Sequence, residues 1–161
     1  MDNKRSVIKQ KTIEHFEKLC QQHGLPLTIQ RRVILKALVD RDDHPTADQI
    51  FEDIKALTPG VSRTTVYRAL ETLVRLGVAR KAKHYKAAAR FDANTGRHHH
   101  LVCLKCDKMA DLDDPSLDQI GLPHPRRTGF EIIDYSVYFE GLCSECRQKK
   151  DEWSDTHRLD S

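Results

Sequence analysis

Two CxxC pairs constrain the fold of this chain more than any other feature of its sequence. The first pair is Cys103 and Cys106, the second is Cys143 and Cys146, and 36 residues separate the two pairs. Four thiolates in two such pairs can close a tetrahedral zinc site that has no open coordination position. A structural zinc ion held in this way ties two distant segments of the chain into one domain.

The rest of the sequence favours a metal over disulfide bonds for these cysteines. The 161 residues contain no run of 18 apolar residues and no signal peptide, so we expect a cytoplasmic protein without a membrane span. Thiols stay reduced in that compartment, where paired cysteines are typical of metal sites. Cys20 stands apart on the apolar face of an expected helix and is interpreted as a small core residue.

Charge is distributed unevenly along the chain, although the formal net charge is only +3. Residues 1–90 contain 18 Lys and Arg against 10 Asp and Glu, whereas residues 91–161 contain 9 against 14. A basic first half joined to an acidic second half indicates that the first half binds a polyanion. A basic surface that is simply solvated is the commoner explanation, so charge alone is weak support.

The first 77 residues predict four helices, each with apolar residues at helical spacing. Thr28 is expected to cap the second helix, and Thr46 with Gln49 forms a capping box for the third. Ser62 is expected to cap the fourth helix, which extends to Leu76. The helices are short and closely spaced, as in a helix-turn-helix domain.

A basic hairpin and the exposed face of the fourth helix together favour DNA binding. Residues 78–85 and 87–91 are predicted to pair, and helices followed by a basic hairpin describe a winged helix-turn-helix. Arg offers charge and bidentate donors, while Thr and Tyr can contact thymine methyls or phosphates in a major groove. An ordinary amphipathic helix with a solvated polar face is the alternative for this helix taken alone. The exposed side of the helix carries Arg63, Thr64, Tyr67, Arg68 and Arg75, of which the first four are the DNA-binding candidates.

The residue pattern changes in the second half of the sequence, where strands are expected in place of helices. Residues 92–100 form a polar connector, and short strands are predicted at residues 101–103 and 109–112, on either side of the first Cys pair. Residues 130–139 are rich in β-branched and aromatic residues and predict the longest strand of the chain. The expected fold class is therefore α+β, with a winged-helix domain followed by a smaller domain that carries the four-cysteine zinc site.

A zinc enzyme and a zinc-stapled module that binds no DNA are the competing interpretations. A zinc deaminase has a catalytic Glu two residues after its ligand His, followed by Pro-Cys-x-x-Cys. Here His98, His99 and His100 are followed by Leu101 and Val102, with neither Glu nor Pro. Four cysteines also saturate zinc and leave no position for a catalytic water. The basic face of the fourth helix argues against the module that binds no DNA.

Several motifs occur in a fixed order between residues 10 and 148. They are the segments Gly24–Arg31, His44–Asp48, Val61–Arg68, Arg90–Asp92 and His98–Cys106, followed by the final CxxC. Taken together, these motifs resemble the ferric uptake regulator (Fur) family of bacterial metal-dependent transcription factors. The resemblance implies a homodimeric repressor that binds an AT-rich inverted-repeat operator in double-stranded DNA when metal is bound.

The resemblance also implies the division of the chain. A winged-helix DNA-binding domain is expected over residues 1–90, and a hinge that carries metal ligands over residues 91–100. An α/β dimerisation domain with the structural zinc is expected over residues 101–148, and a flexible tail over residues 149–161.

The regulatory metal site of the family carries over onto five positions of this chain. They are His44, Asp92, His98, His100 and Asp111. Three imidazoles and two carboxylates make a mixed set suited to Fe(II), Mn(II) or a similar ion, and unlike a soft thiolate site. His98 and His100 lie two residues apart and are expected on the same side of an extended segment. Taken singly, each His is more often a solvated residue than a ligand.

Two features indicate which branch of the family the chain resembles. The last regulatory ligand is usually Asp in the peroxide-responsive regulators and resembles a Glu position in the general iron sensors; here it is Asp111. A further metal site of the family retains His99 and Asp118, but Arg97 and Tyr135 occupy positions where His is usual. A cation and a phenol are poor metal ligands at neutral pH. Both features favour a single regulatory metal and the peroxide branch.

The peroxide branch implies a sensing mechanism based on oxidation of a ligand. Bound Fe(II) reacts with hydrogen peroxide, and a ligand histidine, His44 or His98 here, is modified, after which metal and DNA are released. Mn(II) at the same site would allow repression without sensing. An iron-responsive or zinc-responsive repressor of metal uptake genes is the alternative within the family.

Overall fold

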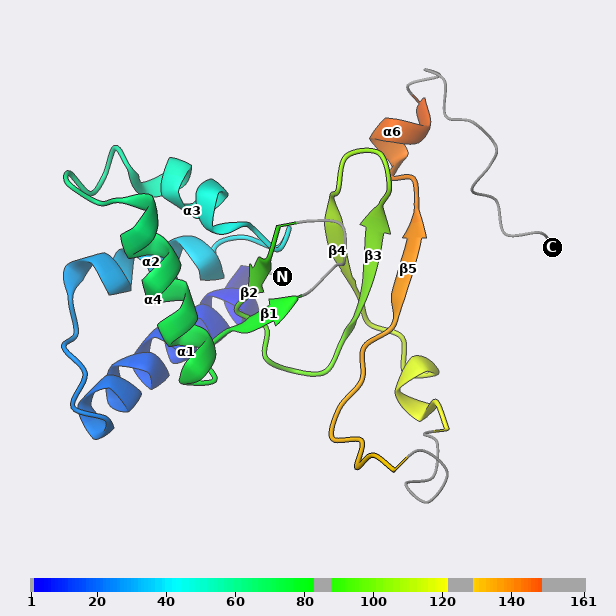
Figure 1. Ribbon diagram of the computed structural model, residues 1–161, viewed down its shortest axis with the longest axis horizontal. Coiled ribbons are helices and arrows are strands. Elements are labelled where there is room, and N and C mark those ends of the chain that lie inside the picture. Colours follow the sequence, from blue (N-terminus) through cyan, green and yellow to red (C-terminus); the bar gives the residue numbers. More distant parts are fainter. Residues whose placement is uncertain (1, 83–87, 122–128, 149–161) are drawn as a thin grey trace. The chain divides into compact units, whose positions relative to one another are not determined.

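The computed structural model describes residues 2–82, 88–121 and 129–148. The chain divides into two compact units, Met1–Arg97 and His98–Ser161, and the division falls within the predicted polar connector. Figure 1 shows four helices and a small sheet in the first unit and a three-stranded sheet in the second. No helix in the described part of the chain is both long enough and apolar enough to cross a membrane.

The first unit contains the four predicted helices, and their predicted N-caps are confirmed. Thr28 and Ser62 each accept a hydrogen bond from the backbone N–H three residues further on. Thr46 and Gln49 make both hydrogen bonds of the predicted capping box. In chain order the helices are α1 (Asp2–Gln22), α2 (Ile29–Val39), α3 (Ala47–Ile54) and α4 (Arg63–Arg75).

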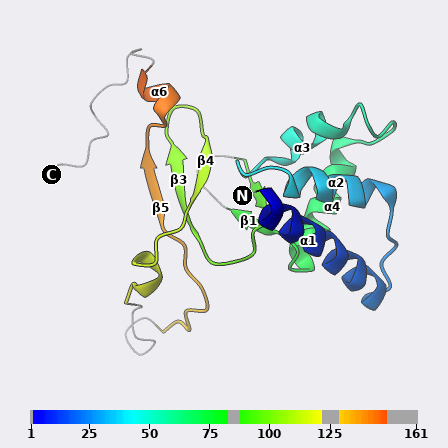
Figure 2. The ribbon, with the colours of Figure 1, turned by 180° about the vertical axis from the view of Figure 1, so that it is seen from behind.

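These helices pack around one hydrophobic core because each contributes apolar side chains at helical spacing. Phe16 of α1, Leu38 of α2, Ile50 of α3 and Leu70 of α4 are completely buried. Cys20 belongs to the same core, which confirms its interpretation as a packing residue. Figure 2 shows α1 in front of α2, with which it is in contact.

A two-stranded antiparallel sheet follows α4. Its strands are β1 (Arg80–Ala82) and β2 (Arg90–Asp92), and Phe91 of β2 is completely buried in the helical core. The predicted basic hairpin is therefore present where its strands pair, while residues 83–87 lie outside the described residues. Because Phe91 anchors β2 to the helices, the strand holds a fixed place beside the α2–α3 connection.

The second unit is built on a mixed sheet with the strand order β4-β3-β5. β3 pairs antiparallel with β4 and parallel with β5, and the strands predicted at residues 101–103 and 109–112 are confirmed. A short 3-10 helix, η1 (Leu117–Gln119), and a short helix, α6 (Ser144–Gln148), were not predicted. The strands are β3 (His99–Cys103), β4 (Met109–Leu112) and β5 (Tyr138–Gly141).

The strand predicted over residues 130–139 is wrong for most of its length. β5 begins only at Tyr138, because β3 offers it no partner further upstream. Within the described part of the chain, no strand lies beside the preceding residues. Phe130 and Ile133 are consequently 74% and 90% exposed.

Candidate metal sites and DNA-binding face

The four cysteines of the CxxC pairs meet at one end of the three-stranded sheet. Cys103 ends β3, and the turn that follows carries Cys106. β5 runs parallel to β3 with Gly141 opposite Cys103, so the chain brings Cys143 beside the first pair. The helix α6 then presents Cys146. Parallel pairing of β3 with β5 is thus what closes the site.

The spacing of the thiols fits a zinc ion. All four Sγ atoms lie within 4.8 Å of one another, and the Sγ atoms of Cys106 and Cys143 are 3.8 Å apart. Tetrahedral Zn–S bonds of about 2.3 Å place the sulfur atoms about 3.8 Å from one another. A disulfide needs a separation of about 2 Å, and all five cysteines of the chain are free thiols. The cluster therefore has the donors and the dimensions of a closed zinc site.

The backbone around Cys103 favours its thiolate form. Burial raises the pKa of this thiol, but hydrogen bonds from the backbone of Cys143, Cys106 and Lys105 outweigh burial and lower the pKa to about 6. One of these donors, the N–H of Cys143, lies 3.4 Å from the Sγ atom of Cys103. Because only the thiolate binds metal, this arrangement prepares the sulfur for zinc.

In the second unit, three of the predicted regulatory ligands lie together. The rings of His98 and His100 are 4.7 Å apart between centroids. Asp111 of β4 pairs directly with His100 of β3, and its Oδ1 atom lies 3.6 Å from Nε2 of His98. The antiparallel β3–β4 pairing therefore gathers two imidazoles and one carboxylate on one face of the sheet.

In the first unit, the other two predicted ligands face each other. His44 lies in the connection between α2 and α3, and Asp92 is the last residue of β2. Nε2 of His44 is 3.6 Å from Oδ2 of Asp92, and the His44 side chain is buried. The five predicted residues thus form two groups, a His–Asp pair in the first unit and a His–His–Asp set in the second.

The predicted DNA-binding residues of α4 are all exposed, but they differ in their contacts. Thr64, Tyr67 and Arg68 are exposed, and Tyr67 packs edge-on against Phe91 of β2. Lys81 of β1 lies 3.4 Å from the hydroxyl of Tyr67 and 2.6 Å from Glu71. The ring of Tyr67 is therefore held against β2, and its hydroxyl lies beside Lys81 of β1.

Arg63 differs from the other three residues in its contacts. Its guanidinium donates to Asp48 and to Glu52 of α3, the latter at 3.0 Å, and lies 4.4 Å from the centre of the Phe51 ring. Arg63 thus connects α4 to α3 through two ion pairs and a cation–π contact. Of the four predicted residues, it is the one whose charge is already engaged within the protein.

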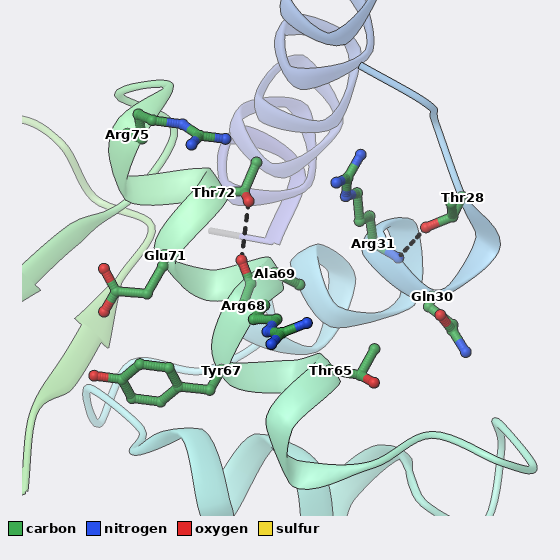
Figure 3. A pocket seen from close by; sticks show the side chains of 10 residues that line it. All are labelled: Thr28, Gln30, Arg31, Thr65, Tyr67, Arg68, Ala69, Glu71, Thr72 and Arg75. Atoms are coloured by element: carbon green, nitrogen blue, oxygen red, sulfur yellow. Dashed lines mark hydrogen bonds between the residues drawn. The ribbon is translucent and has the colours of Figure 1, made fainter.

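An open groove of about 780 Å³ runs between α4 and the N-terminal end of α2. Figure 3 shows that Arg31, Arg68 and Arg75 line it, together with the side chains of Gln30 and Thr65. Three arginines around one groove suit the phosphates of a nucleic acid backbone. Arg75 was expected on the exposed side of the fourth helix, although it was not among the four DNA-binding candidates, and its seven-residue spacing from Arg68 returns it to the same helical face. Arg31 belongs to another helix and was not predicted as a DNA-binding residue.

Comparisons with known proteins show the family of the chain. Residues 22–140 match the sequence profile of the ferric uptake regulator family. The peroxide-responsive repressor PerR of Staphylococcus aureus is 32% identical over 129 residues, which are 80% of this chain and 87% of that protein. The chain belongs to the ferric uptake regulator family.

Solved structures of Fur-family proteins share the fold. The peroxide stress regulator of Campylobacter jejuni superposes with a TM-score of 0.62 at 29% identity, covering 80% of this chain and 97% of that one. The ferric uptake regulator of Helicobacter pylori superposes with a TM-score of 0.72 over 88% of this chain and 95% of that one; at 20% identity, this likeness shows the fold alone. Fur-family members are metal-responsive transcription regulators that bind DNA as dimers, and they are not enzymes. The chain is therefore a metal-responsive repressor of this family.

The Helicobacter pylori Fur is described as having three functional metal-binding sites, and the residues left for a third site here have other partners. Nδ1 of His99 accepts a hydrogen bond of 3.2 Å from Val137 N–H, and Nε2 of His99 lies 3.5 Å from Oδ1 of Asp118. Tyr135 stacks on the His99 ring and donates its hydroxyl to the carbonyl of Leu117. Arg97 and Tyr135 are poor ligands at neutral pH, which leaves His99 and Asp118 as the residues of this set with metal-binding side chains.

Proposed function

We propose that the chain is a DNA-binding repressor that senses hydrogen peroxide through oxidation of a histidine at an Fe(II) or Mn(II) regulatory site. The observation that carries this proposal is the short carboxylate of Asp111 beside His98 and His100, where a general iron sensor is expected to have Glu. The 32% identity to the Staphylococcus aureus peroxide-responsive repressor supports the same branch.

The proposed regulatory ligands are His44, Asp92, His98, His100 and Asp111. Three imidazole nitrogens and carboxylate oxygens suit Fe(II) and Mn(II), which accept mixed N/O ligands. The proposal rests on this donor set and on the family. Metal that binds all five ligands would stabilise the arrangement of the two units that is competent for DNA, because binding energy is available only in that arrangement.

Iron bound there would supply redox chemistry toward hydrogen peroxide, which Mn(II) does not supply at a comparable rate. His44 or His98 then gains one oxygen atom on its imidazole ring in place of a hydrogen. One oxygen of the peroxide enters the ring, and the other leaves as water. The modified ring is a weaker ligand, so the metal is lost and the protein releases DNA.

The proposed assembly is a homodimer in the cytoplasm that binds an AT-rich inverted repeat. Exposed apolar side chains on the second unit support a partner surface, because monomers rarely expose such side chains together. Leu101 and Phe139 are each 44% exposed on adjacent strands of the sheet, and Phe130 and Ile133 are more exposed still. A second copy of the chain would cover them. In each copy, Tyr67 and Arg68 of α4 would read the major groove.

Peroxide treatment of two metal-loaded forms tests the proposal. Protein loaded with Fe(II) or with Mn(II) is bound to operator DNA, and each complex receives a low dose of peroxide. We expect only the iron form to release DNA and to gain one oxygen atom on His44 or His98. The tryptic peptides 42–55 and 98–105 contain these histidines, and fragmentation separates His98 from its neighbours in the second peptide.

An Asp111→Glu variant should keep metal-dependent DNA binding and show weaker oxidation. Asp113→Glu, two residues further on and outside the proposed ligand set, is the matched control and should oxidise normally. If neither histidine gains oxygen while iron is bound, and iron depletion alone releases the operator, the chain is an iron-responsive repressor. Release on zinc depletion alone would identify a zinc-responsive one.

A further inference from the structure

The connection between α2 and α3 holds His44 in an uncommon backbone conformation. Its φ angle is +50°, in the left-handed region, and His44 and Asp107 are the two non-glycine residues with positive φ among the described residues. Histidine enters this region more readily than most residues but still at a cost. The next residue is Pro45, which further restricts the backbone of His44. Such a conformation persists only where the surrounding structure imposes it.

The strand β2 holds the backbone of His44 and its neighbours in this conformation. Phe91 N–H donates to the carbonyl of Pro45 at 2.9 Å, and Thr46 forms an antiparallel bridge with Arg90. The Nη1 atom of Arg90 donates to the carbonyl of His44 at 3.0 Å, and this hydrogen bond is buried. Three consecutive residues of the connection are therefore bound to two consecutive residues of β2.

Alternation along β2 gives its three residues separate tasks. Residues i and i+2 of a strand share a face, so Arg90 and Asp92 lie on the same side of β2, while Phe91 enters the helical core. Arg90 contacts the carbonyl of His44, and Asp92 contacts its imidazole. The strand β2 thus contacts both the backbone carbonyl and the imidazole ring of His44.

The buried charge of Arg90 lies close to an ion-pair network on the connection. Arg90 is 9% exposed; the hydrogen bond from Arg41 is the main cause that lowers the pKa of Asp43, and the charge of Arg90 adds a small effect in the same direction. Arg41 donates to Asp43 through Nε at 2.8 Å and to Asp53 of α3 through Nη1 at 2.8 Å. A buried guanidinium needs hydrogen-bond acceptors, and the carbonyl of His44 is one of them.

We propose that Arg90 is a positioning residue for the regulatory site, which fixes the backbone of His44 so that its imidazole faces Asp92 before metal arrives. The inference rests on the proposed function, because His44 and Asp92 are proposed ligands. Groups that orient a metal ligand typically change metal affinity 10–100-fold when they are removed.

Metal affinity of Arg90 variants tests this role. Arg90→Met keeps an unbranched side chain that can pack in the same place and removes the charge and the donors, and Arg90→Lys keeps the charge and an N–H donor group. Arg32→Met, which removes an exposed arginine paired with Glu17 at 3.0 Å, is the matched control. Mn(II) affinity is measured on the zinc-loaded full chain, well below the melting temperature of every variant.

We expect Arg90→Met to bind Mn(II) about 10–100-fold more weakly, Arg90→Lys to recover most of the loss, and Arg32→Met to match the unaltered protein. The zinc content should be unchanged in all variants. Amide exchange in the Mn(II)-free protein is the second readout, and the Phe91 amide should exchange faster in Arg90→Met. Arg90→Gln replaces Arg90→Met if the latter does not fold.

Two results would overturn the inference while the proposed function stands. One is Mn(II) binding by Arg90→Met as tight as that of the unaltered protein. The other is a lysine variant as weak as the methionine variant, since loss of packing alone would then explain the effect. Failure of the unaltered protein to bind Mn(II) at all is a different result, which would remove the proposed function itself.

Discussion

The two sets of metal-ligand candidates in this chain differ in how they are distributed between the two units. The four cysteines all belong to the second unit, and their positions follow from the pairing of β3 with β5. The five regulatory candidates are divided between the units, with a His–Asp pair in the first and a His–His–Asp set in the second. A thiolate site with four ligands in one unit stabilises the fold of that unit. Nitrogen and oxygen ligands that belong to two units can instead couple metal binding to the arrangement of those units.

Loss of one cysteine is expected to have the largest effect. Structural zinc sites contribute on the order of 10 kcal/mol to folding, so Cys103→Ser should lose about one zinc per chain and unfold the second unit or dissociate the dimer. Elemental analysis and sedimentation measure both outcomes. Cys20→Ser is the control, because Cys20 lies in the core of the first unit and should leave zinc in place. A Cys143–Cys146 disulfide with full dimer stability in zinc-free protein would contradict a structural zinc.

Two neighbouring histidines sharpen the comparison further. His98→Ala removes a proposed ligand and should weaken Mn(II) binding by more than about 100-fold, beyond the usual effect of outer-shell residues. His99→Ala should change it by a few-fold, because Nδ1 of His99 accepts from Val137 and its ring is stacked on Tyr135. Neither variant should lose zinc. If His98→Ala and His99→Ala weakened Mn(II) binding equally, His99 would also bind metal, at a third site. The unaltered protein would then contain more than about two metal ions per chain, zinc included.

On the DNA-binding face, Tyr67→Ala and Arg68→Ala should each weaken operator binding by roughly 1–3 kcal/mol if they read bases. Arg75→Ala should weaken binding to all sequences alike and reduce the salt dependence by about one ion, as a phosphate contact does. Titrations against operator and unrelated DNA at several salt concentrations separate the two roles. Unchanged binding by folded Tyr67 and Arg68 variants would exclude α4 as the reading helix.

Arg63→Ala should have the smallest effect. Its guanidinium is already paired with Asp48 and Glu52, and exposed ion pairs of this kind contribute little to stability because water and salt screen them. We expect a small loss of thermal stability and little change in operator affinity, measured side by side with Arg68→Ala. An affinity loss as large as that of Arg68→Ala would mean that Arg63 leaves α3 when DNA binds.

The sequence alone determined the four helices of the first unit and where they begin. Thr28, Thr46 and Ser62 start helices because their side chains satisfy N–H groups only three residues away. The apolar spacing of α1 to α4 identified the core, and the paired cysteines predicted the cluster of four thiols that the structure shows. All of these rules operate within a few residues or depend on chemistry that a residue type carries by itself.

Tertiary structure decided what depends on partners distant in the chain. β5 is short because a strand extends only as far as its neighbour, which a run of β-branched residues does not reveal. Arg63 is engaged with α3, although its place on α4 resembles that of a DNA contact. Arg90 reaches His44 across 46 positions of sequence, and the packing of β2 against the α2–α3 connection produces that contact. Side-chain partners at such separations follow from packing, and no local pattern in the sequence encodes them.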